Sequence, residues 1–593
     1  MLPDNIKSKI NAIKRIRILY GIIIISFVIF GIRLFYVQII QYNHYQAAAL
    51  SYQLKKYELP ANRGIIEAIN GNHAIPIVLN QTLYTLYADP QYIKHPDKIA
   101  QKVVGVIGGN ASTYVKQMVL PHLKYVILAK KLTSGQNKKI LSFKIPGIGT
   151  QAQYYRTYPD GSLAAQILGF VNNNGKGEYG IEQALNKQLA GTPGRVKAIT
   201  DVNGIPLAAV KGNIEKQPVN GDNVVLTINI AMQRQLEQIL ASEYKKTKSQ
   251  GLSAIVMNPN TGQIDAMANY PTFNPSNYAN VSNQKIFQNA AVDNAIEPGS
   301  TMKTLTTPAA LNLGVIQPNT SYFDPAHWVI DGFNIHDIKS DGGAREQNIA
   351  SILALSLNTG AVWMLMQMGG GQIDQKGIDA WHSYMINHYR LGQPTGIEQG
   401  YEASGYVPPA NMSDPSIDLR YANTAFGQGV QLTALQLAAA DSSVLNGGTY
   451  YQPTLVDEII KPNGQVINNK PKVLEKNVVK KSVGQAMIPL LENVVKTYLG
   501  FGFGFMNFPS NYIVGGKTGT AQVAKPGGGG YYSNIYNGTY TGFVGGNHVQ
   551  YVVTVYNIKP NVPGYAGSYG GQPVFADIVH MLINEGYVSP KTN

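Results

Sequence analysis

One long apolar segment near the N-terminus divides this chain into a part that can lie in a membrane and a part that cannot. The segment starts with ILYGIIIISFVIFGI over Ile18 to Ile32 and continues past Arg33 to Ile40. A helix over residues 18–40, rising about 1.5 Å per residue, can cross a hydrocarbon layer of about 30 Å. Cations precede it at Lys7, Lys9, Lys14, Arg15 and Arg17. By the positive-inside rule we predict a cytoplasmic tail over 1–17, a transmembrane helix over 18–40 and an extracytoplasmic remainder.

The alternative for this segment is a signal peptide that is removed after export. A signal peptide ends in a pattern of small residues at the cleavage site. Here the apolar run is followed by Arg33 and aromatic residues instead. We therefore predict that the segment stays attached as an anchor.

Length and composition exclude several classes of protein. A chain of 593 residues exceeds the size of one ordinary core, so we expect at least two domains. The absence of cysteine excludes disulfides, thiolate metal sites and cysteine nucleophiles. The net charge of +14 is not gathered in a basic helix or a nucleic-acid motif, so we predict no nucleic-acid partner. A membrane surface or an anionic cell wall is the expected counterpart of this charge.

The order of patterns along the rest of the chain predicts two domains of different character. Residues 41–221 combine short β-like runs, such as Ala74 to Leu79 and Val126 to Ala129, with Gly and Pro. No catalytic group of residues stands out there, so we interpret this part as an elongated, β-rich, non-catalytic pedestal. A second domain is expected over residues 222–593.

The second domain contains strands at both ends and helices between them. NVVLTIN from Asn223 is a strand candidate, and a turn at Asn258 to Gly262 joins two apolar runs as in a hairpin. Helical patterns dominate between about Ser300 and Lys496, and β candidates such as VQYVVTVYNI return near the C-terminus. The pattern predicts a mixed α/β or α+β fold, with a central sheet built from both ends of the domain and flanked by helices.

The strongest chemical signal lies in EPGSTMKT, where a Pro-Gly turn precedes Ser300 and Lys303 follows one helical turn later. Residues at i and i+3 share a helix face, so the lysine can take the serine proton if it is largely neutral. Two other pairs have this spacing, Ser242 with Lys245 and Ser282 with Lys285. Both lie in polar surroundings, so we predict that they are solvated surface.

Two further motifs follow in order along the chain. Ser356-Leu357-Asn358 ends an apolar helical run, and Lys517-Thr518-Gly519-Thr520 lies in a predicted strand. With Ser300 and Lys303, this set resembles the Ser-x-x-Lys, Ser-x-Asn and Lys-Thr-Gly motifs of the penicillin-recognising serine transferases.

The resemblance to class B penicillin-binding proteins covers nearly the whole chain. It includes PANRGIIEAINGN from Pro60, RTYPDGSLAAQILGFVNNNGKGEYGIE from Arg156 and FGQGVQLTALQLA from Phe426. EPGSTMK is more similar to the septum-forming division enzyme than to the elongation enzyme. Three features depart from the family: Ala68-Ile69-Asn70-Gly71 replaces Asp-Arg-Asn-Gly, Pro308 should kink or end the nucleophile helix, and GFGFGFMNF at Gly500 to Phe508 has no precedent.

The resemblance implies a peptidoglycan D,D-transpeptidase that cross-links stem peptides through a serine acyl-enzyme. Ser300 would be the nucleophile, Lys303 its general base, and Ser356 the proton relay to the departing amine. Asn358 would bond Lys303 and the substrate backbone, while Lys517 would repel the charge of Lys303. The residues implied to bind the substrate carboxylate and backbone are Thr518, Gly519 and Thr520, with Gly519 letting the substrate lie close to the strand.

The resemblance also implies an oxyanion hole made of the backbone N–H groups of Ser300 and Thr520. No cofactor and no metal are implied. The ten histidines lack a paired zinc spacing, and His336 with Asp337 and Asp341 is interpreted as a surface loop.

The expected partners are stem peptides, β-lactams, the membrane, a glycan polymerase of the shape, elongation, division and sporulation family, and other divisome proteins. The expected location is the cell membrane, with a single pass and a catalytic domain outside, at the division septum. Alternatives are an elongation-type enzyme, a serine β-lactamase or carboxypeptidase, and a β-lactam sensor or scaffold. We also predict a mobile loop over Pro526 to Tyr540. Its Tyr531, Tyr532 and Tyr536 would either cover bound substrate or form a solvent-exposed hairpin.

Overall fold

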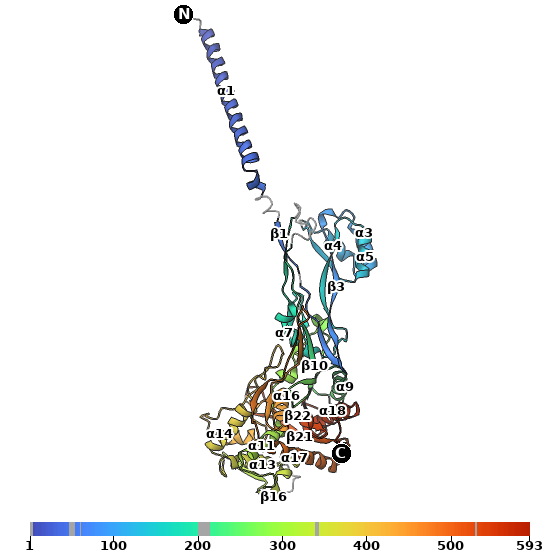
Figure 1. The fold of residues 1–593 in the computed structure, drawn as a ribbon, viewed down its shortest axis with the longest axis vertical. Coiled ribbons are helices and arrows are strands. Elements are labelled where there is room, and N and C mark those ends of the chain that lie inside the picture. Colours follow the sequence, from blue (N-terminus) through green and yellow to red (C-terminus); the bar gives the residue numbers. More distant parts are fainter. Residues whose placement is uncertain are drawn as a thin grey trace. The chain divides into compact units, whose positions relative to one another are not determined.

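The computed structural model describes residues 4–46, 54–59, 61–121, 123–199, 214–337, 343–527 and 530–592 (Figure 1). The chain divides into two compact units. Residues 1–61 and 191–220 form the first, and residues 62–190 and 221–593 form the second.

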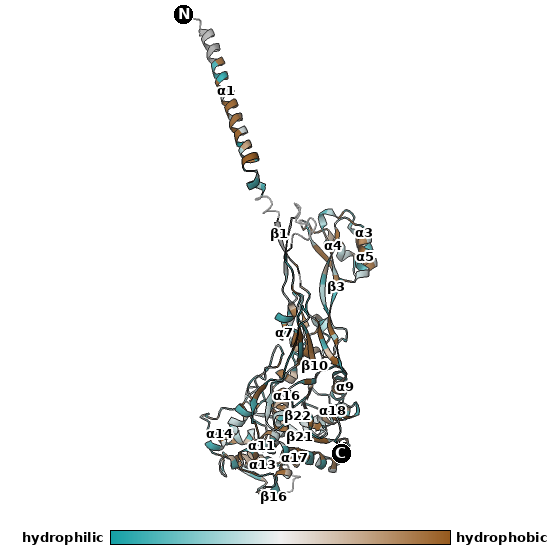
Figure 2. Cartoon of the chain, in the orientation of Figure 1, coloured by the Kyte–Doolittle hydropathy of each residue, from teal (hydrophilic) through white to brown (hydrophobic). Residues whose placement is uncertain are grey.

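The first unit contains the apolar helix and a small sheet. Helix α1 spans Asp4–Phe35, and a π-helical turn continues it over Tyr36–Ile40. Within the described residues, the part from Ile13 to Ile40 is the one helix long and apolar enough to cross a membrane, and Figure 2 shows its hydrophobic band. A three-stranded sheet in the order β1 (Leu54–Leu59), β8 (Gly194–Ile199), β9 (Ile214–Lys216) belongs to the same unit.

A seven-stranded sheet in the second unit combines segments from distant parts of the chain. Its order is β19 (Val466–Asn468), β18 (Val456–Ile460), β10 (Asn223–Asn229), β2 (Ile66–Asn70), β3 (His73–Ala88), β4 (Val126–Leu132), and β5 (Ile148–Thr157) also pairs with β3. Strand β10 runs parallel to β2 and antiparallel to β18. The predicted β-like runs at Ala74 and Val126 are therefore parts of longer strands.

Three helices beside β3 and β4 were not anticipated from the sequence. They are α3 (Pro96–Ile107), α4 (Ala111–Met118) and α5 (Ser134–Ser142). The side chain of Asn110 caps α4, and Thr133 forms a capping box with Gln136 at α5, so the starts of these two helices have a local cause. Their apolar faces share a core with Leu86 and Leu128. The β-rich description of this region is incomplete for that reason.

Two segments that carry the family resemblance meet at one buried carboxylate. Glu182 is fully buried and accepts hydrogen bonds from Arg63 Nε and Arg156 Nε, each at 2.6 Å. Two guanidinium groups compensate the cost of burying this charge. The Arg-Gly sequence at Arg63 and the RTYP sequence at Arg156 thus have a shared structural role.

A five-stranded antiparallel sheet forms the centre of the second unit. Its order is β12 (Ile264–Tyr270), β11 (Gly251–Met257), β23 (Val549–Ile558), β22 (Tyr531–Gly545), β21 (Ile513–Ala524). Strand β11 pairs with β23 along its whole length. The prediction of a sheet built from both ends of the domain is confirmed, as is the hairpin at Asn258 to Gly262.

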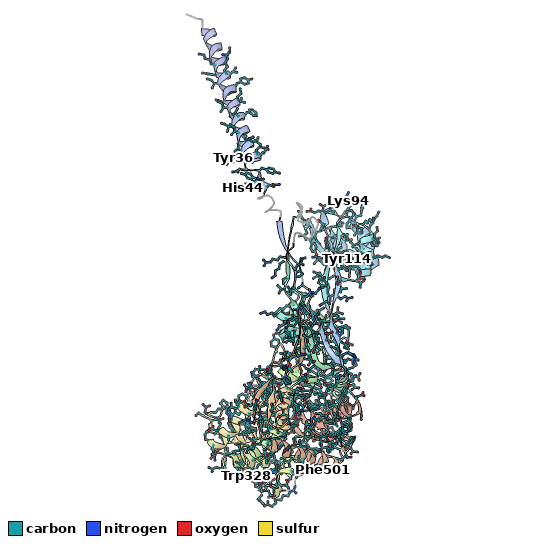
Figure 3. All side chains as sticks on the ribbon, in the orientation of Figure 1. Tyr36, His44, Lys94, Tyr114, Trp328 and Phe501 are labelled. Atoms are coloured by element: carbon teal, nitrogen blue, oxygen red, sulfur yellow. The ribbon has the colours of Figure 1, made fainter. Side chains whose placement is uncertain are left out.

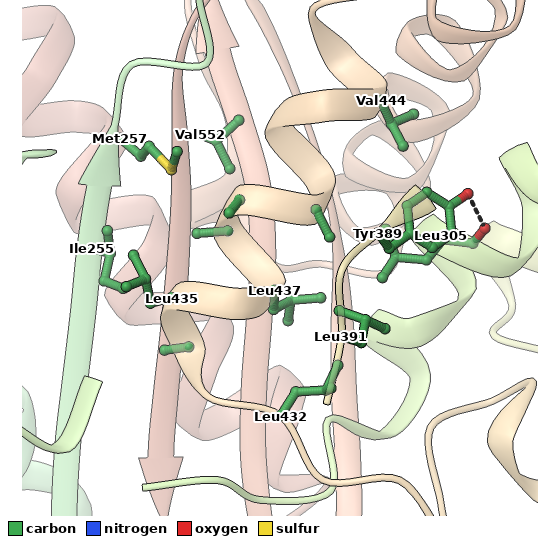
Figure 4. Close-up of a cluster of buried hydrophobic side chains, with 14 of the residues drawn as sticks. Ile255, Met257, Leu305, Tyr389, Leu391, Leu432, Leu435, Leu437, Val444 and Val552 are labelled. Carbon is green, nitrogen blue, oxygen red and sulfur yellow. Dashed lines mark hydrogen bonds between the residues drawn. The ribbon is translucent and has the colours of Figure 1, made fainter. Parts of the chain in front are cut away.

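Helices cover both faces of this sheet because its strands are apolar on both sides. Ala254 and Val256 of β11 join a core with α9 (Ile230–Thr247) and α18 (Gln572–Asn584). Ile255 and Met257 face α16 (Ala434–Leu445) on the other side, where Leu435 and Val552 lie nearby (Figure 4). The alternation along one strand thus separates two layers of helices.

Two sequence predictions need correction. Helix α11 (Lys303–Leu313) does not end at Pro308 but continues to Leu313, where Gly314 with φ of 75° closes it. The predicted mobile loop over Pro526 to Tyr540 is also too long, because Tyr531 to Tyr540 belong to strand β22 and pair with β21. Strands β21 and β22 thus form a hairpin, and residues 528–529 of the predicted loop lie outside the described residues. The role of its tyrosines in covering bound substrate stays a prediction.

Candidate active site

Ser300 lies on a tight turn pressed against the last strand of the central sheet. A 3-10 turn over Gly299–Met302 leads into α11, so the α-helix starts three residues later than the sequence suggests. Gly299 has a φ of 59°, and a Cβ there would lie 2.8 Å from Thr520 O and 3.0 Å from Thr520 N. Only glycine fits this conformation at this contact. The backbone segments of Ser300 and Thr520, predicted to form the oxyanion hole, therefore adjoin.

Lys303 is fully buried and gathers the predicted motif residues around its amine. Its Nζ donates to Ser300 Oγ at 3.0 Å and to Asn358 Oδ1 at 2.9 Å. It also donates to the backbone oxygen of Ser356 at 2.7 Å and lies 3.4 Å from Ser356 Oγ. In a 3-10 turn, residues at i and i+3 eclipse each other, which brings the lysine over the serine.

Ser356 occupies a turn between two helices rather than the end of one. Helix α12 covers Ile349–Ala354 and α13 covers Asn358–Met368, with Ser356 at a φ of 61° between them. A left-handed conformation costs a non-glycine residue roughly 1 to 2 kcal/mol. Surrounding contacts must hold the turn, and one of them is the bond from Lys303 to the Ser356 oxygen.

Lys517 is a second fully buried lysine, and it lies on β21 as predicted. Its Nζ donates to Thr518 O at 3.1 Å and Thr518 Oγ1 at 3.3 Å. Burial holds the pKa of Lys517 well below its usual value, and the nearby charge of Lys303 lowers it further. The charge of Lys303 thus acts on Lys517, and the predicted effect of Lys517 on Lys303 stays a prediction.

These groups open onto a cavity of about 580 Å³. The predicted site residues that line it are Ser300, Ser356, Asn358, Thr518 and Thr520. Aromatic side chains supply much of the remaining wall, namely Phe426, Tyr498, Tyr536 and Tyr565. Such a mixture of apolar walls and a few convergent polar groups is typical of a ligand site.

Gly519 has a packing reason for its small size in addition to the one predicted. A Cβ at Gly519 would lie 2.2 Å from Thr539 Oγ1 and 2.4 Å from Pro298 O. The missing side chain thus faces the nucleophile turn and lets that turn pack onto β21. The predicted close approach of a substrate to Gly519 stays a prediction beside this packing reason.

Two residues at the cavity were missed in the sequence analysis. Asp337, interpreted as surface loop, lines the cavity and accepts hydrogen bonds at the start of α13, whereas Asp341 lies outside the described residues. Tyr498 pairs its hydroxyl with Thr518 Oγ1 at 3.0 Å. Neither residue belongs to a short motif, so only the tertiary structure reveals them.

The unprecedented segment Gly500 to Phe508 provides aromatic packing for Tyr498. The ring of Phe503 lies 5.4 Å from that of Tyr498 and 5.5 Å from that of Tyr569. Phe501, which is labelled in Figure 3, is largely exposed, and its ring packs edge-on against that of Tyr498. The segment therefore supports one wall of the cavity.

The two other Ser/Lys pairs with the same spacing lie at the surface. Ser242 and Lys245 are exposed on α9, and Ser282 and Lys285 are exposed near a 3-10 turn at Gln284–Phe287. The prediction that both are solvated is confirmed. The structure brings only the Ser300 pair together with the other two motifs.

Family models match most of the chain. Residues 252–580 match the penicillin-binding protein transpeptidase domain, and residues 58–226 match the penicillin-binding protein dimerisation domain. The fold and the clustered motifs agree with these matches. The chain belongs to the penicillin-binding protein transpeptidase family.

Two relatives resemble the chain in sequence, and two solved structures share its fold. The chain is 28% identical to stage V sporulation protein D of Bacillus subtilis over 97% of this chain and 86% of that protein. It is 24% identical to the peptidoglycan D,D-transpeptidase FtsI of Escherichia coli K12, over 91% and 86%.

The fold of penicillin-binding protein 2X from Streptococcus thermophilus matches with a TM-score of 0.73 at 24% identity, covering 90% of this chain and 80% of that one. Penicillin-binding protein 3 of Mycobacterium tuberculosis with aztreonam matches at 0.68 and 24% identity, over 91% and 98%. With both family domains in one chain, the protein is a class B penicillin-binding protein, a serine D,D-transpeptidase of peptidoglycan.

Proposed function

We propose that Ser300 is the nucleophile with which this enzyme cross-links peptidoglycan stem peptides at the division septum. The observation that carries the assignment is the bond from the fully buried Lys303 Nζ to Ser300 Oγ at 3.0 Å. In its neutral form, the Lys303 amine at this distance can instead accept the Ser300 hydroxyl proton as the hydroxyl attacks a carbonyl.

In the first step, Ser300 Oγ attacks the carbonyl carbon of the penultimate D-Ala, and its proton passes to Lys303. The tetrahedral oxyanion accepts hydrogen bonds from the backbone N–H groups of Ser300 and Thr520. Ser356 then relays a proton to the amine of the departing D-Ala, and the acyl-enzyme remains. In the second step the amine of a neighbouring stem peptide attacks this ester and gives up a proton to Lys303. The peptide bond forms as the C–O bond to Ser300 breaks, and Ser300 Oγ takes back a proton from Lys303.

The terminal carboxylate of the donor peptide binds near Lys517, Thr518 and Thr520. Asn358 keeps Lys303 in place and bonds the peptide backbone. Support comes from the contacts of Asn358 with Lys303 and of Lys517 with Thr518. Hydroxyl and amine N–H donors suit a carboxylate, whose negative charge also favours the protonated form of Lys517, and no cofactor is required for acyl transfer.

The test of this proposal is covalent labelling by penicillin, read by intact-mass spectrometry. The native chain should gain one penicilloyl group that is released slowly, and Ser300→Ala should gain none. Rapid release of penicilloic acid would indicate a β-lactamase instead. A stable adduct without transfer to an acceptor amine would indicate a sensor or scaffold.

The septal role rests on the EPGSTMK sequence and on the likeness to FtsI proteins. A second candidate is wall synthesis during sporulation, which is favoured by the likeness to stage V sporulation protein D. Depletion of the protein separates these roles. Filamentous cells and a fluorescent fusion at midcell are expected for the septal enzyme, rounded cells for an elongation enzyme, and a defect confined to spores for the second candidate.

The N-terminal helix is proposed as a retained single-pass anchor, with residues 41–221 as pedestal and 222–593 as catalytic domain. Its exposed apolar surface and the cations before it support this orientation. We propose that the N-terminal helix and the pedestal contact a membrane glycan polymerase of the shape, elongation, division and sporulation family and other divisome proteins. A mature chain that starts after about residue 40 and washes free of membranes would contradict the anchor.

A further inference from the structure

The first backbone N–H groups of helix α13 need hydrogen-bond acceptors from outside the helix. The helix begins at Asn358, the last residue of the Ser356-Leu357-Asn358 motif, and most of its residues are buried. The first N–H groups of a helix have no partner within the helix. Leu357, at the position before it, has an apolar side chain that cannot accept a hydrogen bond.

Asp337 supplies these acceptors from a distant segment. Its Oδ1 accepts from Asn358 N at 2.5 Å and from Thr359 N at 3.1 Å, and its Oδ2 accepts from Thr359 Oγ1 at 2.5 Å. A carboxylate at a helix N-terminus is also favoured by the helix dipole. Asp337 therefore caps α13 in place of a residue of the helix itself.

The same segment orients the side chain of Asn358. The backbone oxygen of His336, the last residue of β15 (Phe333–His336), lies 3.4 Å from Asn358 Nδ2. The Asn358 Oδ1 atom is then directed to Lys303 Nζ at 2.9 Å. A chain of contacts runs from Asp337 through Asn358 and Lys303 to Ser300.

Asp337 can act on Lys303 through its charge and on the start of α13 through its hydrogen bonds. Burial raises the pKa of its carboxyl group, while hydrogen bonds from Thr359 and the charge of Lys303 oppose that rise and the charge of Asp324 adds to it. The carboxylate thus has an electrostatic interaction with the catalytic lysine as well as three hydrogen bonds. Variants must separate the two contributions.

We propose that Asp337 is a positioning residue for the acylation step, which holds the left-handed Ser356 turn and Asn358 in contact with Lys303 by capping α13. This inference rests on the proposed role of Ser300 as nucleophile. It gives Asp337, outside the three motifs, a defined function in the reaction.

The test compares Asp337→Ala with Asp337→Asn in the full chain, using the rate of covalent labelling by penicillin. The alanine removes the cap, and a misplacement of about 1 Å should slow acylation at saturating penicillin roughly 100-fold. The asparagine keeps one oxygen for the two backbone N–H groups, and Thr359 Oγ1 can accept from its amide. Asp337→Asn should therefore acylate within about tenfold of the native rate. The remaining loss is expected because hydrogen bonds to a neutral amide are weaker than those to a carboxylate.

Asp374→Ala is the matched control. Asp374 caps α14 (Gln375–Ser383) through Gly377 N at 2.9 Å, so its loss should lower stability by a similar amount without slowing acylation. If Asp337→Ala does not fold, Thr359→Val tests the same point, because it deletes the bond from Thr359 Oγ1 to Asp337 Oδ2 and leaves the Asp337 carboxylate on the two backbone N–H groups, so it should slow acylation roughly threefold.

Two results would overturn the inference. One is native acylation in Asp337→Ala or, if that variant does not fold, in Thr359→Val. The other is an equal loss in the alanine and asparagine variants, which would assign the effect to charge rather than to capping. Failure of the native chain to form any penicilloyl adduct would instead contradict the proposed function, so the two failures are distinguishable.

Discussion

Ser300 with Lys303 and Ser242 with Lys245 have the same spacing and entirely different surroundings. Lys303 is fully buried and bonds Ser300, Ser356 and Asn358, whereas Ser242 and Lys245 face solvent on α9. A solvated lysine remains protonated at neutral pH and cannot accept a proton from serine. Burial and neighbouring groups, rather than spacing, make the first pair chemically competent.

The environment of the first pair has a further cation that the second lacks. Lys517 is also fully buried and interacts with the charge of Lys303. Two buried amines in one site disfavour the doubly protonated state. Substitutions at Lys303, Asp441 and Tyr498 test separate parts of this buried environment.

The largest effect is expected when the base is removed. Lys303→Ala should slow covalent labelling by penicillin roughly 100- to 10,000-fold, the usual contribution of a general base. Lys245→Ala on α9 is the matched control and should label at the native rate. Equal rates for the two variants would mean that burial does not distinguish the pairs.

A second prediction concerns Asp441, a buried carboxyl group whose pKa is raised by its environment. Its carboxyl group is buried behind the site and accepts from Thr304 Oγ1 and Thr541 Oγ1, each at 2.6 Å. Burial raises the pKa of Asp441 from 3.8 to about 7. Because the folded state has the higher pKa, its contribution to stability is complete below pH 3.8 and is lost as the pH rises to about 7.

Between pH 5 and pH 8, this loss should amount to roughly 2 to 3 kcal/mol of the free energy of unfolding, at about 1.4 kcal/mol per unit of pKa difference. Asp441→Asn should remove this part of the pH dependence. Urea unfolding of both proteins at several pH values measures it. Parallel curves for the two proteins would contradict a titrating Asp441.

The smallest effect is expected at the aromatic wall. Tyr498→Phe removes one hydroxyl that pairs with Thr518 Oγ1 and keeps the ring contacts with Phe503. A neutral hydrogen bond contributes about 0.5 to 1.5 kcal/mol, so acylation should slow between about twofold and tenfold. Phe501→Ala, at the exposed end of the cluster, should leave the rate unchanged. A native rate for Tyr498→Phe would show that the hydroxyl pair between Tyr498 and Thr518 does not contribute to acylation.

The sequence predicted the parts of the site that depend on local order. Ser300 and Lys303 lie within one turn, and the Lys517 strand has a β pattern of its own, so motifs and periodicity were sufficient. Asp337 and Tyr498 were not predicted from the sequence, because their partners Asn358 and Thr518 lie 21 and 20 residues away along the chain. These contacts depend on how separate elements pack.

The same limit applies to the fold. The central sheet was predicted from its apolar strands, while the parallel pairing of β10 with β2 and the helices beside β3 were not. The left-handed turn at Ser356 is likewise held by tertiary contacts, since serine has no local preference for that conformation.

Mapping the penicilloyl group tests most directly the claim that burial selects Ser300 among the serines with this spacing. The full chain is incubated with penicillin and digested, and the modified peptide is identified by mass spectrometry. The account predicts the added mass on the peptide that contains Ser300 and no adduct in Ser300→Ala. An adduct on a peptide containing Ser242 or Ser282, or labelling that persists in Ser300→Ala, would contradict it.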